Sequence, residues 1–396
     1  MRKLTEDNSF WLLAIFAAAY ILCNIGTGSL TTWDEAVYAN ISGNILKTGD
    51  WLILHQGQNQ WFDKPPLYMW CTAIFYKIFG INEFSVRLTS ALFGIATILL
   101  VYIFVKKLVN QKAAMLAALL LLAAPQYLHY SKMGMMDVTL TFFITLMIYL
   151  FWMGRERPSY LFWSGATLLF AYFTKGFGAI FGPVILFAYC LFSGELRLLI
   201  KREFILGISI SILGIFAWHL TQYLLAGPDA INNYFGFHIV KRTTTTLEGH
   251  YGGLNFYQKA IFNKNKPWSV LYYASLAYAL WLMIKNRDKK AILVIAWVAV
   301  VYAVCSIVRT KLHWYIMPVY PALAISSAVL LERFFKERLF PLILAFLMSG
   351  LLIQVPVSYA FKLDFNPRVK DAALHSKQLA YEDDGTMFYY ETVRVK

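Results

Sequence analysis

Apolar residues along the chain are gathered into long runs that short polar segments separate. Most runs approach the ~20 residues that an α-helix needs to cross the hydrocarbon core of a membrane. The runs lie at 10–28, 86–105, 113–129, 138–153, 159–173, 177–193, 204–226, 269–284, 290–308, 312–331 and 338–360. This pattern predicts an all-α polytopic membrane protein with about eleven transmembrane helices.

Two polar stretches, 29–85 and 227–268, are too long to be simple turns between spans. The first is predicted to contain two amphipathic juxtamembrane helices. Residues 34–47 show an apolar face with helical spacing, and Gly49 follows as a stop signal. Residues 67–79 follow a double proline and are apolar, but they are too few to span, so we expect an interfacial helix.

The composition agrees with a membrane protein and argues against a soluble one. Hydrophobic residues make up 59% of the 396 residues and charged residues only 15%, well below the ~25% of soluble proteins. The sequence therefore predicts a transmembrane domain at 1–360 and a short external C-terminal segment at 361–396, which reads as the remnant of a larger domain. The four cysteines show neither a disulfide framework nor zinc-ligand spacing.

The formal net charge of +14 has a topological explanation. Cationic residues cluster in short loops between spans, whereas a nucleic-acid-binding protein would spread them over a soluble face. The clusters are Arg2 and Lys3; Lys106, Lys107 and Lys112; Arg155 and Arg157; Arg197, Lys201 and Arg202; Lys285, Arg287, Lys289 and Lys290; and Arg333, Lys336 and Arg338. A single alternating topology places all of them in the cytoplasm, so both long loops and the C-terminal segment are expected outside.

The external face then collects an unusual set of ionisable residues, which are costly at membrane depth and suggest function. They are Asp34, Glu35, Asp63, Lys64, Asp137, Lys175, His238, Lys241, Arg242 and Lys311, with Tyr315 beside the last of them. Taken singly, an acid after a span is often only solvated, and a lysine there often only anchors its helix at the interface. Their occurrence on one side, beside two amphipathic helices, is what favours a common site.

Carboxylates together with several cations favour a particular chemistry. A carboxylate can accept the proton of an attacking hydroxyl, and lysine or arginine can bind a phosphate as it leaves. Because the chain shows no P-loop and no dinucleotide-binding glycine motif, we do not expect a nucleotide-sugar donor. The residues predict transfer of a group from a lipid phosphate at the external membrane face.

Several motifs resemble the C-type-fold membrane glycosyltransferases, a family of protein O-mannosyltransferases and the bacterial aminoarabinose transferase that modifies lipid A. They occur in the family's order over roughly residues 10–330. In order along the chain they are WDEAVYA, DKPPLYMW, KMGMMDV, TKG, HIVKR and KLHWYIMPVYPALA. One departure is His313, where the family usually has the proline of KLP, and members sometimes have thirteen spans, which this chain could match.

The resemblance implies roles for individual residues. Asp34 would be the catalytic carboxylate and Asp137 a second acid that positions Asp34 or the acceptor. The donor and its phosphate would be bound by Glu35, Lys64, Lys175, Lys241, Arg242, Lys311 and Tyr315. Asp63 and His238 match positions that can bind a divalent metal, although the sequence offers no strong ligand cluster and we expect no required cofactor.

The resemblance thus implies an inverting glycosyltransferase of the bacterial inner membrane that uses a polyprenyl-phosphate sugar, a hexose or a pentose, on the periplasmic side. The acceptor would be lipid A, another glycolipid, a glycan or a protein. If the acceptor atom is an ionised phosphate oxygen, Asp34 would orient the donor instead of acting as a base. The alternative is a transporter or lipid flippase, which should show internal repeats and ionisable residues near the middle of its spans. The sequence shows neither of these features.

Overall fold

The computed structural model describes residues 2–31, 34–241 and 251–334, together with 345, 347 and 349–351. For 2–7 and 237–241 it describes the backbone only. The elements are α1 (Arg2–Leu22), α2 (Asp34–Thr48), β1 (His55–Gln56), β2 (Asn59–Gln60), α3 (Leu67–Phe79), α4 (Glu83–Leu108), α5 (Gln111–Leu122), α6 (Pro125–Ser131), α7 (Met136–Met153), α8 (Ser159–Lys175), η1 (Gly176–Ile180), α9 (Phe181–Ser193), η2 (Leu196–Leu198), α10 (Arg202–Ala226), α11 (Pro228–Ile231), η3 (Asn232–Lys241), α13 (Phe256–Lys264), α14 (Trp268–Asn286), α15 (Lys289–Ile307), η4 (His313–Val319) and α16 (Tyr320–Phe334).

Within these described residues, six helical runs are long and apolar enough to cross a membrane, and α5 with α6 forms a seventh if a bent pair is one span. The prediction of an all-α membrane protein is confirmed. The count of eleven stays a prediction. The predicted spans 10–28 and 269–284 are not among these six runs, 159–173 and 177–193 fall within one of them, and the run at 338–360 lies largely outside the described residues. The expectation of one helix at 113–129 was wrong, because the chain bends by 68° between α5 and α6. Pro125 occupies the first turn of α6 and cannot donate the hydrogen bond that would continue α5.

Polar residues set the beginnings of several helices. Asn82, Asn110 and Asp288 each accept a hydrogen bond from the backbone N–H three residues later, which caps α4, α5 and α15. α4 also begins with an acidic residue, Glu83, and ends with basic ones, the arrangement that the helix dipole favours.

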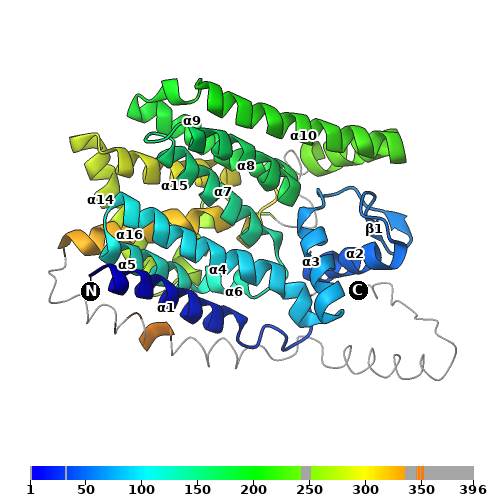
Figure 1. Cartoon of the computed structure of the whole chain (residues 1–396), viewed down its shortest axis with the longest axis horizontal. Coiled ribbons are helices and arrows are strands. Elements are labelled where there is room, and N and C mark those ends of the chain that lie inside the picture. Colours follow the sequence, from blue (N-terminus) through cyan, green and yellow to red (C-terminus); the bar gives the residue numbers. More distant parts are fainter. Residues whose placement is uncertain are drawn as a thin grey trace.

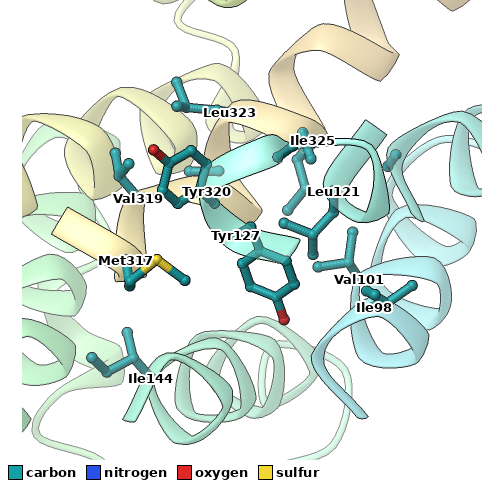
Figure 2. Packing of buried hydrophobic residues seen from close by; sticks show 14 of the residues in the cluster. Ile98, Val101, Leu121, Tyr127, Ile144, Met317, Val319, Tyr320, Leu323 and Ile325 are labelled. Carbon is teal, nitrogen blue, oxygen red and sulfur yellow. The ribbon is translucent and has the colours of Figure 1, made fainter. Parts of the chain in front are cut away.

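The core lies where α4, α5, α6, α7, α16 and η4 meet, and Figure 2 shows part of it. Its two central tyrosines carry hydroxyls that are satisfied internally. Tyr127 donates to the carbonyl of Gly94 at 2.9 Å, and Tyr320 donates to Oε1 of Gln126 at 2.7 Å. The rings supply large apolar area while the hydroxyls join separate helices, so the bundle has a defined packing.

α2, α3 and the β1–β2 hairpin form a cap over one end of the bundle (Figure 1). The predicted helices at 34–47 and 67–79 are confirmed as α2 and α3, and Gly49, with φ of 72°, follows the end of α2. A second apolar cluster holds the cap together; it consists of Tyr38, Ile41, Ile45, Leu54, Trp61, Tyr68, Met69, Ala73 and Met136. The short hairpin, in which His55 pairs with Gln60, was not predicted.

α10 lies on the outside of the bundle, against α8 (Figure 1). Glycines allow the two backbones to approach closely, because a Cβ on Gly207 would lie 2.1 Å from the carbonyl oxygen of Phe162. Ser211 donates across the same interface to the carbonyl of Gly165 at 2.8 Å. The opposite face of α10 exposes a row of large apolar side chains, as expected for a surface that faces lipid.

At the end of the bundle away from the cap, one carboxylate joins three loops. Glu195 pairs with Arg155 at 3.0 Å and with Lys289 at 2.7 Å, and it accepts a hydrogen bond from the Tyr189 hydroxyl. Arg155 and Lys289 belong to basic clusters that the sequence assigns to the same membrane side. The structure therefore brings these loops together, and the assignment of this end to the cytoplasm stays a prediction.

Candidate active site

A buried ion pair between Asp137 and Lys175 lies at the capped end of the bundle. Asp137 is in the first turn of α7, and Lys175 is the last residue of the neighbouring helix α8. Each charge therefore sits at the helix end where the macrodipole stabilises it. Lys175 donates to Oδ1 of Asp137, and both side chains are largely buried. The second oxygen, Oδ2, is buried and has no hydrogen-bond partner among the residues that the structure describes, so one strong acceptor remains available there.

Asp34, the first residue of α2, is half-buried and lies close enough to Asp137 for the two carboxylates to interact electrostatically. The phenol of Tyr130 lies within electrostatic range of both carboxylates. Tyr315 contacts the lysine of the pair, because its ring centroid lies 4.7 Å from Nζ of Lys175. The structure thus brings together Asp34, Asp137, Lys175 and Tyr315, which come from α2, α7, α8 and η4.

Glu35 has a different environment from its neighbour. Only 1% of Glu35 is exposed, and it forms a buried ion pair with Arg87 of α4 at 2.8 Å. It also accepts hydrogen bonds from the backbone N–H groups of Thr31 at 2.7 Å and Gly134 at 2.8 Å. Gly134 permits this approach, because a Cβ there would lie 2.8 Å from Val86 and 3.1 Å from Cγ of Glu35. These contacts give Glu35 a role in positioning α2, and substrate binding by Glu35 stays a prediction.

The charge state of Glu35 follows from these contacts. Burial alone would raise the pKa of the carboxyl, but the hydrogen bond and charge of Arg87, with the N–H groups of Thr31 and Gly134, outweigh it and lower the pKa. Arg87 also donates to the carbonyls of Ile25 at 2.8 Å and Ser29 at 2.9 Å. Arg87 thus holds the chain before Asp34, through Ile25 and Ser29, and directly after it, through Glu35.

Lys311, predicted to bind phosphate, lies between α15 and η4 and is 5% exposed. Its ammonium donates to the carbonyls of Cys305 at 3.0 Å, Ser306 at 2.5 Å and Val308 at 2.6 Å. All three donors are thus engaged at the C-terminal end of α15, where a cation is favourable. Burial lowers the pKa of Lys311. In this arrangement Lys311 caps a helix.

Lys64 lines a pocket between the cap and α10, with about 310 Å³ of empty space including its open mouth. Its Nζ donates to the carbonyl of Asp63 at 3.0 Å. The walls are Leu54, Trp61, Phe62, Pro65, Trp218, His219, Gln222, Ala230 and Tyr234. The pocket adjoins the ion pair, because Gly176, directly after Lys175, contacts Tyr234 and Pro65.

The remaining predicted residues belong to the second long loop. The side chains of His238 and Lys241 lie outside those that the structure describes, as does Arg242 entirely. Asp63 is described, but its proposed metal partner His238 is not, so this pair stays a prediction. Among the described residues, no group of three or more His, Cys, Asp or Glu side chains could hold a metal ion.

Two residues of this region were missed by the sequence reasoning. Arg87 and His219 both lie within predicted spans, at 86–105 and 204–226. The rule that an ionisable residue within a span suggests function would have identified both. The prediction used only ionisable residues at the ends of the spans, so it left both of them out.

Known proteins resemble the chain in sequence. The family model for dolichyl-phosphate-mannose-protein mannosyltransferase matches residues 63–221. An uncharacterized protein of Aquifex aeolicus is 30% identical over 331 residues, which cover 82% of this chain and 74% of that protein. The undecaprenyl phosphate-alpha-4-amino-4-deoxy-L-arabinose arabinosyl transferase of Aeromonas salmonicida is 26% identical over 349 residues, 85% of this chain and 62% of the relative. The chain thus spans less than two thirds of that transferase.

Solved structures resemble it in fold. ArnT from Cupriavidus metallidurans bound to undecaprenyl phosphate superposes with a TM-score of 0.74 and 25% identity, over 88% of this chain and 63% of ArnT. The oligosaccharyltransferase AglB of Archaeoglobus fulgidus, in complex with an inhibitory peptide and a dolichol-phosphate, has a TM-score of 0.59 and 12% identity, over 95% of this chain and 58% of AglB. At that identity the likeness to AglB shows a common fold alone.

Proposed function

Because the chain belongs to the ArnT/PMT-like family of membrane glycosyltransferases, we propose that it transfers a sugar from a polyprenyl-phosphate donor to a lipid, glycan or protein acceptor. The reaction takes place at the capped end of the bundle, which faces the periplasm or exterior of the inner membrane. The sugar is a hexose or a pentose.

The observation that carries the proposal is the grouping of two carboxylates and a lysine at one end of the molecule, near a pocket that contains a second lysine. Asp34 lies within electrostatic range of the buried Asp137–Lys175 pair, and the pocket that contains Lys64 lies near this pair through the turn at Gly176. A base and an anion-binding cation are the two functions that transfer from a lipid phosphate requires.

The transfer inverts the configuration at C1 of the sugar. Asp34 accepts the proton of the acceptor hydroxyl, and the acceptor oxygen forms a bond to C1. The bond between C1 and the phosphate oxygen breaks on the opposite face, and this oxygen keeps the electron pair. Lys64 neutralises the added charge on the departing prenyl phosphate. If the acceptor is an ionised phosphate oxygen, no proton moves and Asp34 orients the donor.

Asp137 positions the reactants through its free oxygen, while Lys175 maintains its charge and Tyr315 packs on that lysine. Lys241 and Arg242 are assigned to the donor phosphate on the resemblance of HIVKR to the family motif. The proposal needs no cofactor, and a divalent ion held by Asp63 and His238 would add positive charge near the phosphate.

The alternative of a transporter or flippase is not favoured. The two acids of the proposed site, Asp34 and Asp137, lie at one end of the spans, and the named relatives reported above are transferases. A transporter that alternates access should present its ionisable residues from the middle of the bundle.

Substitution of Asp34 by Asn tests the proposal. Mass spectrometry of envelope lipids and glycans, from cells with and without the chain, identifies the molecule that gains a sugar. We expect Asp34→Asn to reduce this product about 10²–10⁴-fold, the usual contribution of a general base, at normal expression and membrane insertion. Asp229→Asn removes an exposed carboxylate at the same end and should leave the product unchanged. Full transfer by Asp34→Asn would exclude the base role.

A further inference from the structure

α10 carries an ionisable residue, His219, that the proposed reaction does not use. It lies seven residues before the end of α10 at Ala226, about 10 Å along the helix axis. This places it just inside the membrane-spanning part, below the external end. An ionisable side chain at such a depth suggests function and calls for a partner.

The ring of His219 is held by two neighbouring elements. Its Nε2 lies 2.7 Å from the hydroxyl of Tyr172 on α8. Its ring centroid is 4.8 Å from that of Tyr234, which η3 supplies. Tyr234 in turn contacts Gly176, so that a Cβ on this glycine would lie 2.0 Å from the Tyr234 hydroxyl. Tyr234 thus lies between the ring of His219 and the turn that follows Lys175.

His219 and Lys64 line the same pocket from opposite elements, α10 and the segment before α3. Three of the other walls are the aromatic residues Trp61, Phe62 and Trp218. None of the described lining residues is acidic, and the Gln222 amide is occupied by the carbonyl of Leu52 at 2.9 Å. A cation and an imidazole in an apolar wall without a carboxylate favour an anionic ligand.

The hydrogen bond to Tyr172 decides what the other nitrogen can do. When the Tyr172 hydroxyl donates to Nε2, the neutral ring carries its hydrogen on Nδ1. When the ring is protonated, both nitrogens are donors. In both of these states Nδ1 is a donor and can serve an oxygen in the pocket, whereas a neutral ring that donates from Nε2 to Tyr172 would leave Nδ1 as an acceptor.

We propose that His219 is a second phosphate-binding residue of the donor site, which donates from Nδ1 to a phosphate oxygen of the prenyl phosphate that Lys64 binds. This inference rests on the proposed function, because it takes the Lys64 pocket as the phosphate site. Tyr172 is a positioning residue that holds the imidazole in place. As the bond from C1 to the phosphate breaks, His219 and Lys64 share the charge that develops on the leaving oxygen, and no co-reactant is needed.

The test is binding of a C15 prenyl phosphate and of the matching prenyl alcohol to the purified full chain in phosphatidylcholine nanodiscs. His219→Gln retains an N–H near the Nε2 position, whereas His219→Asn retains one near Nδ1. We expect His219→Gln to weaken phosphate binding about tenfold, the scale of one charge-assisted hydrogen bond, and to leave alcohol binding unchanged. His219→Asn should recover most of the phosphate affinity. Tyr223→Phe, on the exposed face of the same helix, is the matched control and should bind both probes normally.

The outcomes separate this inference from the proposed function. Normal phosphate binding by His219→Gln, with weakened binding by Lys64→Ala, would overturn the role of His219 and leave the donor site intact. Normal binding by both variants would remove the donor site itself. Equal losses for phosphate and alcohol, or no recovery by His219→Asn, would reduce His219 to a packing residue. Competition by phosphatidylglycerol or inorganic phosphate as strong as that by prenyl phosphate would show a general anion pocket and also overturn the inference.

Discussion

Replacement of Arg87 by Met tests whether the buried pair with Glu35 holds the catalytic end together. The Arg87 and Glu35 side chains are 3% and 0% exposed, so neither charge is solvated when its partner is lost. Breaking a buried pair in this way costs about 3–5 kcal/mol of unfolding free energy. The substitution also removes the hydrogen bonds that Arg87 donates to the carbonyls of Ile25 and Ser29, which precede Asp34 in the chain. We expect both lower stability and reduced transfer.

The assay is thermal unfolding of the purified protein in detergent, followed by tryptophan fluorescence. At roughly 2 °C per kcal/mol, the melting temperature should fall by about 6–10 °C. Arg155→Met is the matched control, because its pair with Glu195 is partly exposed, with 24% and 16% of the side chains accessible, and should contribute less than about 1 kcal/mol.

The double variant Glu35→Gln with Arg87→Met removes the orphaned carboxylate and should recover part of the loss. A melting temperature that falls no further for Arg87→Met than for Arg155→Met would refute the reasoning. So would a double variant less stable than the sum of the single changes.

Three further predictions follow from the same contacts. Lys175→Met leaves Asp137 buried without a counter-charge and should lower the free energy of unfolding by about 3 kcal/mol or more. The double variant Lys175→Met with Asp137→Asn should recover the stability, measured by thermal unfolding, but it should not recover transfer. Gly207→Ala should cost about 1–3 kcal/mol, because its Cβ meets backbone at 2.1 Å, whereas Gly214→Ala meets only the flexible Leu169 side chain; equal melting temperatures would contradict this. The folded protein holds the pKa of Glu35 below its ordinary value of about 4.5, so the ionised carboxylate stabilises the fold above that pH. The melting temperature should therefore fall as the pH drops below about 4.5, and it should fall less steeply for the Glu35→Gln protein.

Local patterns in the sequence predicted much of the fold. The apolar runs gave most of the long helices, and the positive-φ glycine at 49 correctly marked the end of α2. Pro125 also indicates a break by its residue type, but the continuous apolar run favours a single helix, and the prediction followed the run. The hairpin at 55–60 was missed because two-residue strands carry too few positions to show alternation.

The site was harder to predict because its contacts join distant segments. Asp137 and Lys175 could be placed at one end from the topology, but their direct pairing depends on how α7 and α8 align. Glu35 and Asp34 are neighbours in sequence, yet one faces Arg87 inside the protein and the other lies beside Asp137. Spacing alone could not decide which of the two acids is buried, because the partner of Glu35 lies 52 positions further along the chain.

α10 lies at the periphery of the bundle and packs closely on α8 through glycines. This position bears on how a substrate would reach the pocket. One wall of the Lys64 pocket is a helix whose other side exposes large apolar side chains. Under the proposed function, a prenyl-phosphate carrier would enter this pocket sideways from the membrane and leave by the same route, so that its tail would never have to enter water. Turnover would then depend on the lateral diffusion of carriers within the bilayer, and it should respond to the fluidity of the surrounding lipid.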